Sequence, residues 1–416
     1  VETSFTGYLG TRSVTQFLAI PAATQAPPQH GGGVVDFDRD YNGVDARALL
    51  RFGDTDLVIG VSQETQVDDR LGNENFIGTP PNQTLGVVGR VRRDETDRAT
   101  SRDAYAQVET PLSSQWQLVA GVRTGQVAMD VQDHYIVPPN GDDSGSLKFS
   151  YTNPALGLRW RVAPQWTLHA SVARGFESPT LGELAYKPDG SSGFNSGLQG
   201  QSSRQLEAGS KWRGETFDVD AVLFLINTDN EIGVATNAGG RSSFQNVGST
   251  RRYGAEAAAW WRLSPTLRAQ ANVTLLNARY LDSFLTCNAV PCTAPNVPVP
   301  AGNRIAGTQR AIGGAELAWR PGVLPGEFGV EWHAQSSTPV DDLNSDAAAG
   351  FGVVGLRWGA DWAITDSGKL QTLLRLDNLF DRRYAGSVIV NEANKRFFEP
   401  GAPRNYLLSL RWLQRF

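Results

Sequence analysis

The sequence predicts an all-β fold, an antiparallel transmembrane β-barrel, and three observations carry this prediction. Apolar and polar residues alternate with a period of two along the chain, the connections alternate between short and long, and tryptophans gather beside the short connections. Short turns at one end and long loops at the other are typical of bacterial outer-membrane barrels. We count about sixteen strands of roughly ten to fifteen residues, long enough to cross a bilayer at a tilt.

The composition excludes several other classes of protein. The 416 residues carry a net charge of -5 with no basic stripe, which argues against a nucleic-acid-binding protein. No apolar run approaches the eighteen or so residues that a transmembrane helix needs. Met129 is the only methionine, so we expect a processed chain or a fragment that has no signal peptide.

The alternation is clear where the strands are most regular. Leu156, Leu158 and Trp160 fall on one face of a strand, and Arg159 and Arg161 fall on the other. Soluble β-sandwiches also alternate, but their strands are shorter and their apolar face points inward. Connection length separates the two folds.

The connections differ sharply in length. Short turns are expected near 53–54, 112–114, 163–165, 213–215, 264–266, 321–326 and 365–368. Long polar loops are expected near 20–40, 69–98, 137–146, 175–203, 233–248, 283–307, 338–349 and 384–403. The long loops would face the outside of the cell and the short turns the periplasm.

Tryptophans close to the short turns or to the C-terminus indicate an aromatic girdle at one membrane interface. These residues are Trp116, Trp166, Trp212, Trp261, Trp319 and Trp412. Core tryptophans would instead lie in mid-strand with no relation to turn length. The expected location is therefore the bacterial outer membrane, with lipid and lipopolysaccharide as neighbours.

Several local patterns resemble the TonB-dependent receptor family, in the same order and spacing. They are GVR at 121–123, RGFESPTLGEL at 174–184, EAGSK at 207–211, RYGAE at 252–256, DNLFD at 377–381 followed by Tyr384, and the terminal Phe416. The resemblance covers nearly the whole chain. It implies that residues 1–416 are the C-terminal part of a receptor barrel.

A second set of patterns is similar to the branch of this family that takes up pyrroloquinoline quinone (PQQ). These are DHY at 133–135, NGDDSG at 140–145, DGSSG at 189–193, CNAVPC at 287–292, GSVIVNE at 386–392 and FEP at 398–400. In many siderophore receptors an arginine follows the Gly-Phe pair, whereas this chain has Glu177. PQQ would be the transported ligand and not a cofactor.

The resemblance also implies an architecture and a partner. Receptors of this family have a barrel of twenty-two strands that is filled by an N-terminal plug. We therefore expect this chain to lack the plug and about six strands. Uptake would be energised by the TonB complex of the inner membrane, which contacts the plug region.

Charged residues on the inward face of the strands are expected to line a wet, mutually paired lumen. They are Arg47, Arg123, Arg159, Lys211, Arg252, Arg357, Arg375, Arg411, Asp45, Glu109, Glu207, Asp218, Asp220, Glu256, Glu316, Glu331 and Asp361. Only groups near the extracellular mouth can meet a ligand first.

A flat tricarboxylate such as PQQ calls for arginine or lysine to pair with its carboxylates and for an aromatic face to stack on its rings. The external segments supply Tyr186, Lys187, Arg241, Arg252, Lys395, Arg396, Phe397 and Phe398. The alternative for each of them, which the sequence favours individually, is a solvated loop residue.

Cys287 and Cys292 lie in one short loop, which indicates a local disulfide in an oxidising compartment. The alternative is two reduced surface thiols. No metal site is expected: the four histidines are dispersed, and Asp142 and Asp143 are read as a polar turn in preference to a calcium site.

The sequence does not point to an enzyme, because no H-E-x-x-H or G-x-S-x-G motif occurs. The G-x-G-x-x-G match at 350–355 is not followed by a helix pattern. The alternatives to PQQ uptake are a ferric siderophore receptor of the same family, an outer-membrane hydrolase and a passive porin. Clustered Asp and His at one rim would favour the hydrolase, and short loops would favour the porin.

Overall fold

The computed structural model describes residues 1–79, 82–188, 192–238, 241–287, 292 and 294–415. The predicted motif residues at 189–191, the whole segment 288–291 between the two cysteines, and the terminal Phe416 lie outside this part. Sixteen strands form one sheet in which neighbouring strands are antiparallel, so the predicted fold class is confirmed. No helix among the described residues is long and apolar enough to cross a membrane.

The strands of the large sheet follow one another in chain order. The missing labels belong to short strands of the loops, which are not part of this sheet. They are β1 (Glu2–Phe17), β2 (Val34–Phe52), β3 (Thr55–Asn73), β6 (Val91–Pro111), β7 (Trp116–Asp133), β8 (Gly145–Ala163), β9 (Trp166–Glu177), β10 (Gln201–Arg213), β11 (Phe217–Asp229), β14 (Thr250–Ser264), β15 (Leu267–Tyr280), β18 (Ala311–Trp319), β19 (Glu327–Gln335), β22 (Phe351–Ala363), β23 (Gly368–Asp377) and β26 (Asn405–Gln414).

The remaining elements are short and lie in the long connections. They are β4 (Phe76–Ile77), β5 (Thr84–Leu85), β12 (Ile232–Ala238), β13 (Arg241–Asn246), β16 (Phe284–Thr286), β17 (Val297–Val299), β20 (Thr338–Pro339), β21 (Ala347–Ala348), β24 (Ala385–Val388), β25 (Phe398–Pro400), the 3-10 helix η1 (Ala22–Gln25) and the helix α1 (Leu181–Leu184). Each pair of short strands forms its own two-stranded hairpin.

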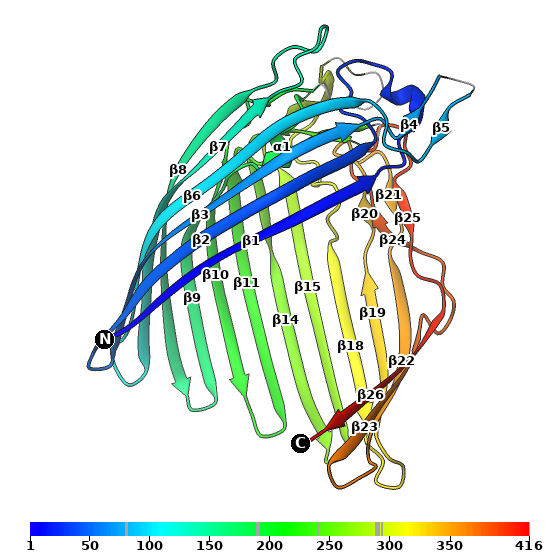
Figure 1. The fold of residues 1–416 in the computed structure, drawn as a ribbon. Coiled ribbons are helices and arrows are strands. Elements are labelled where there is room, and N and C mark those ends of the chain that lie inside the picture. The colour runs from blue at the N-terminus through cyan, green and yellow to red at the C-terminus, as the bar shows by residue number, and fades with distance from the viewer. Residues whose placement is uncertain (80–81, 189–191, 239–240, 288–291, 293, 416) are drawn as a thin grey trace.

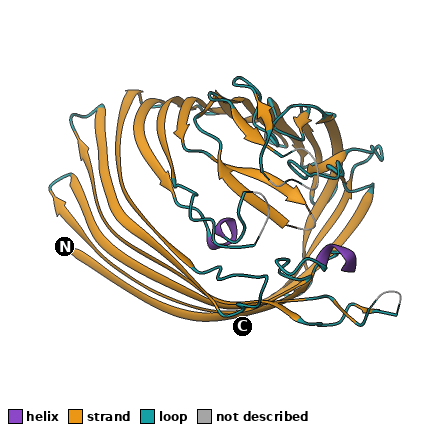
Figure 2. Ribbon diagram, turned by 90° about the horizontal axis from the view of Figure 1, so that it is seen from above, coloured by secondary structure: helices purple, strands orange, loops and turns teal. Residues whose placement is uncertain are grey.

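The sheet curves strongly, and all its short turns lie at one end (Figure 1). Viewed from above, the strands wrap around α1 and parts of the long loops, which lie inside the curve (Figure 2). Strands β1 and β26 are the edges, since within the described residues no pairing joins them. The long loops therefore meet over the mouth of one curved wall.

Side chains alternate between the two faces of this wall, as the period-two pattern predicted. Leu223 in β11 points outward and is 63% exposed, whereas the adjacent Val222 lies opposite Glu256 of β14 on the inward face. A shallow outer groove is lined by apolar residues of β8, β9, β10 and β11, among them Leu156, Val172 and Leu206. An apolar outer band of this kind suits contact with lipid tails.

The predicted short turns are all present, and the long loops alternate with them. Two predicted loops were wrong in extent, however. The loops expected at 20–40 and 69–98 overlap residues that are strand in the structure, because β2 begins at Val34, β3 runs to Asn73 and β6 begins at Val91. These strand ends are rich in polar and charged residues, a composition that resembles that of a loop.

Charge pairing across strands explains how such polar segments remain in the sheet. Arg39 of β2 pairs with Asp68 of β3 at 2.7 Å, and Arg70 of β3 pairs with Glu95 of β6 at 3.2 Å. Such cross-strand pairs stabilise a sheet modestly where water is present. The first strands thus extend past the apolar band as a charged ladder.

The predicted tryptophans lie at the short-turn ends of their strands. Trp116 begins β7 and stacks on Trp160 of β8 with ring centroids 5.1 Å apart, while Trp212 of β10 pairs in register with Trp166 of β9. Trp319 ends β18. This position fits an interfacial girdle, where the ring is apolar and its N–H can bond to water.

Many inward charges are paired, as expected for a wet lumen. Arg357 forms ion pairs with Glu316, with Glu327 at 3.0 Å and with Glu331 at 3.2 Å. Arg375 also pairs with Glu331, at 2.8 Å. These side chains form a network of ion pairs on the inward face of the wall, so each charge already has a partner within the network.

The assignment of faces predicts a contrast between two adjacent residues. Leu223→Arg places a charge in the lipid-facing band and should destabilise the assembled barrel by about 2–4 kcal/mol. Val222→Arg, one residue away, places the same charge in the wet interior beside Glu256 and should be tolerated. Assembly yield and denaturant unfolding in lipid measure both variants, and equal losses would contradict the assignment.

Cys287 and Cys292 are joined by a disulfide, with Cα atoms 6.0 Å apart. Because the closed ring is small, the bond should stiffen the loop tip and add little to global stability. Alkylation of the exported protein without reductant, followed by mass spectrometry, should leave both cysteines unlabelled. Labelling of both cysteines would favour the reduced form.

Candidate functional site at the mouth

Four segments that are distant in sequence meet around Tyr186 at the mouth. We define the Tyr186 cluster as Tyr186, His30, Arg93 and Arg241. His30 comes from the loop after β1, Arg93 from the start of β6, Tyr186 from the loop after β9, and Arg241 from the start of β13. Two of the four, Tyr186 and Arg241, belong to the ligand residues predicted from sequence.

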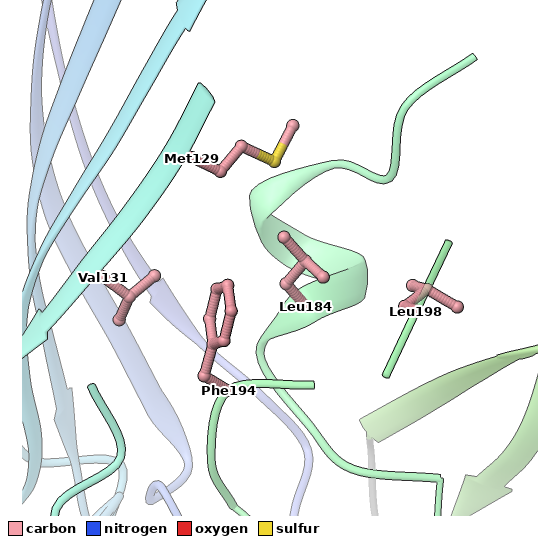
Figure 3. Close-up of a cluster of buried hydrophobic side chains, with 5 residues drawn as sticks. All are labelled: Met129, Val131, Leu184, Phe194 and Leu198. Carbon is pink, nitrogen blue, oxygen red and sulfur yellow. The ribbon is translucent and has the colours of Figure 1, made fainter. Parts of the chain in front are cut away.

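The helix α1 holds the Tyr186 loop in place. Thr180 and Glu183 form a capping box at its N-terminus, in which each side chain bonds to the other residue's backbone N–H. Leu184 is fully buried and packs in a cluster with Met129 and Val131 of β7 and with Phe194 and Leu198 of the same loop (Figure 3). This apolar cluster fixes the loop against the wall two residues before Tyr186.

Two guanidinium groups lie against the ring of Tyr186. The Cζ atoms of Arg93 and Arg241 are 4.8 Å and 4.9 Å from the ring centroid. Arg93 Nη1 also donates to the Tyr186 hydroxyl at 3.3 Å, and Nη2 donates to the Ala185 carbonyl at 3.0 Å. Stacking on an aromatic face tolerates two like charges close together because the ring attracts both.

The charges are only partly balanced. Arg93 pairs with Glu95 at 3.3 Å, but no carboxylate lies within ion-pair distance of Arg241 among the described residues. Burial, together with the charges of Arg93 and Arg92, lowers the pKa of Arg241 to about 10, although Tyr186 opposes the shift. Burial would raise the pKa of Tyr186, yet the charges of Arg93 and Arg241 outweigh it and lower that pKa. The cluster therefore carries an excess of positive charge.

His30 is held at the cluster by a glycine-rich turn. Gly32 has φ +84° and its N–H donates to His30 Nδ1 at 3.1 Å. A Cβ on Gly32 would stand 2.2 Å from the Asn73 carbonyl oxygen, so the turn packs directly on the end of β3. A left-handed φ and this close approach both require glycine.

The other predicted ligand residues are not members of the cluster. Lys187 is exposed beside it, close to Asp143, whose pKa is raised by burial and lowered in part by Lys187. In the last loop, Lys395 occupies a turn with φ 63°, Arg396 and Phe398 are exposed, and Phe397 is buried.

Arg252 is already paired with a carboxylate of the protein itself. Its Nη1 and Nη2 atoms donate to the carboxylate of Glu231 at 2.9 Å and 2.5 Å, and Nη1 donates to Thr250 Oγ1 at 3.0 Å. Glu231 is 9% exposed and is the residue before β12. The bidentate pair fixes the base of the β12–β13 hairpin, and this pairing differs from the ligand contact expected for Arg252.

A buried carboxylate joins several loops over the mouth. Asp342 is 2% exposed and accepts hydrogen bonds from the Tyr280 hydroxyl at 2.5 Å and from Asn391 Nδ2 at 2.8 Å. Asn391 Nδ2 also donates to the Val234 carbonyl of β12 at 2.9 Å. We call these residues the Asp342 latch. It ties the last loop to the hairpin that carries Arg241.

Sequence reasoning missed His30, Arg93 and the Asp342 latch. The run of three glycines after His30 was an available signal, because it predicts a turn that can approach another backbone closely. Arg93 and Asp342 gave no such signal, since their environment depends on loops that meet only in the folded chain.

The pairing of Arg252 with Glu231 predicts a structural effect. Arg252→Met would leave the Glu231 carboxylate buried with Thr250 as its remaining partner, and should weaken the β12–β13 hairpin by about 1–3 kcal/mol. Hydrogen exchange of the hairpin amides measures this loss, and adding Glu231→Gln should restore much of it. Reduced solute affinity with unchanged exchange would instead favour direct ligand contact by Arg252.

Comparison with known proteins identifies the family. Residues 3–379 match the model of the TonB dependent receptor-like β-barrel. The ferrioxamine B receptor of Salmonella typhimurium is 26% identical over 220 residues, which cover 52% of this chain and 28% of the relative.

Solved structures resemble the fold. The siderophore receptor PiuA from Acinetobacter baumannii has a TM-score of 0.74 at 14% identity, with coverage of 92% of this chain and 57% of that one. The copper transporter OprC has a TM-score of 0.70 at 18% identity with the same coverage. This chain spans little more than half the length of these structures, and less of the curated relative. It belongs to the TonB-dependent receptor family of outer-membrane β-barrels.

Proposed function

We propose that this chain is the C-terminal barrel part of a receptor that binds an anionic solute at its mouth and imports it with energy from the TonB complex. The observation that carries the proposal is the Tyr186 cluster. Two guanidinium groups lie against one aromatic ring there, and among the described residues no carboxylate pairs with Arg241, whose buried Nη2 atom has no hydrogen-bond partner. A buried positive charge of this kind favours an anion that supplies the missing partner.

PQQ is the first candidate for the solute. It is planar and carries three carboxylates, so one molecule could pair with Arg241 and also lie against an aromatic face. The patterns shared with the PQQ-receptor branch support the same choice, including Glu177 in place of arginine. In this proposal a plug segment and further strands complete the receptor.

A ferric siderophore is the second candidate. Its support comes from the relatives, since one is a ferrioxamine B receptor and another a siderophore receptor. The low identities leave the solute open, because receptors with the same fold bind different cargo, including copper in OprC. Binding experiments on the full-length receptor can separate the two candidates.

Titration of the full-length receptor with PQQ, followed by tryptophan quenching, should give saturable binding. Arg241→Met should weaken that binding about tenfold or more, since a charge-assisted hydrogen bond contributes about 1.5–3 kcal/mol. The control is Arg251→Met: Arg251 donates to Asn227 on the neighbouring strand, and its loss should leave affinity unchanged. The exposed pair Lys395→Ala and Arg396→Ala should have a smaller effect than Arg241→Met.

Tight binding of a ferric chelate with no binding of PQQ would replace the first candidate by the second. Equal affinity of wild type and Arg241→Met for every anionic solute tested would remove the Tyr186 cluster from the binding site.

A further inference from the structure

Two buried hydrogen-bond donors in the Tyr186 cluster have no acceptor among the described residues. They are His30 Nε2 and Arg241 Nη2. Buried polar groups are nearly always hydrogen-bonded, because an unsatisfied one keeps the full penalty of its lost hydration. Two such groups in one cluster therefore point to a missing acceptor.

The bonding of His30 fixes its Nε2 atom as a donor. The side chain is 7% exposed, and burial together with the charges of Arg241, Arg92 and Arg93 lowers its pKa to about 3. The ring is therefore neutral at physiological pH. Because Nδ1 accepts the Gly32 N–H at 3.1 Å, the single ring proton is on Nε2.

Arg241 lies beside Gly31, the residue that follows His30 in the chain. A Cβ built on Gly31 would stand 3.8 Å from Arg241 Nη2, 3.6 Å from the Tyr186 hydroxyl and 3.7 Å from Arg93 Nε. The absent side chain of Gly31 thus leaves a gap that can hold at least a methyl-sized group and that faces three polar groups.

The neighbouring arginines, Arg92 and Arg93, already donate hydrogen bonds to other acceptors or form ion pairs. Arg93 is bonded to the Ala185 carbonyl and to Glu95, and Arg92 donates to the His30 carbonyl at 3.3 Å and to Glu74 at 3.4 Å. These two arginines add positive potential. Within the part of the chain that the structure describes, the donors of this cluster that lack an acceptor are His30 Nε2 and Arg241 Nη2. The missing acceptor should therefore be negatively charged.

We propose that His30 Nε2 and Arg241 Nη2 together bind one oxyanion group, in the space beside Gly31. The group is a carboxylate of the imported solute, and in this respect the inference rests on the proposed function. The histidine supplies a neutral N–H and the arginine supplies the charge. The pair thereby sets specificity for a charged group: an amide or ester in place of the carboxylate would leave the positive charge of Arg241 unbalanced.

Selenate tests the subsite without reference to the true solute, since it is an oxyanion with an anomalous X-ray signal. Crystals of the full-length receptor soaked in selenate should show a peak within hydrogen-bond distance of His30 Nε2 and Arg241 Nη2. The peak should be lost in His30→Phe and in Arg241→Met. It should remain in His134→Phe, which alters an exposed histidine beside Thr96.

Gly31→Ala gives a milder variant that should fold normally, because its methyl group would make ordinary contacts of 3.6–3.8 Å. It should fill the space and reduce selenate occupancy. No peak at His30 and Arg241 in the wild type, or an unchanged peak in Gly31→Ala, His30→Phe and Arg241→Met, would overturn the subsite.

PQQ titration of the same variants separates this inference from the proposed function. His30→Phe should weaken PQQ binding about tenfold, and His30→Gln, which keeps an N–H near the Nε2 position, should recover part of the loss. Tight PQQ binding that is unchanged in His30→Phe would overturn the subsite and leave the function standing. A selenate peak with no PQQ binding would support the subsite and reject PQQ.

Discussion

The structure depends on one constraint, which is that a strand inside a bilayer must find every backbone hydrogen-bond partner within the protein. Between the edge strands β1 and β26, the antiparallel ladder meets this constraint through an uninterrupted register, such as that of β10 with β11 and of β11 with β14. Once the register is fixed, each side chain points either to lipid or to the interior. The apolar outer band, the charged inner wall and the short turns at one rim all follow from it.

The same constraint favours a functional site in the loops over one on the wall. Charged residues on the wall, such as Arg357 and Glu316, form ion pairs with one another and line the lumen. The long connections are free of the ladder, and they can bring together residues that are far apart in sequence, as His30, Tyr186 and Arg241 are. The Tyr186 cluster at the mouth is therefore compatible with a rigid wall, because each is built from different parts of the chain.

Much of the wall could be predicted from sequence, because its rules are local: a period of two, a tight turn and a tryptophan beside it. The extent of β2, β3 and β6 could not, since charged ends such as Asp68 are stabilised by partners on other strands. Of the predicted ligand residues, Tyr186 and Arg241 lie together, whereas Arg252 is bonded to Glu231. Neither outcome could be read from sequence, because each depends on which loop approaches which, and loop contacts have no periodicity.

The Asp342 latch has a consequence for the energetics of recognition. A receptor with independent loops would lose conformational entropy when they close on a solute, at about 0.5–1.5 kcal/mol for each immobilised side chain. Here Asn391 connects the last loop to the hairpin that carries Arg241 through direct hydrogen bonds. The two loops are joined as the chain folds, so the mouth is preorganised. For the receptor that we propose, more of the contact energy would then remain available as affinity.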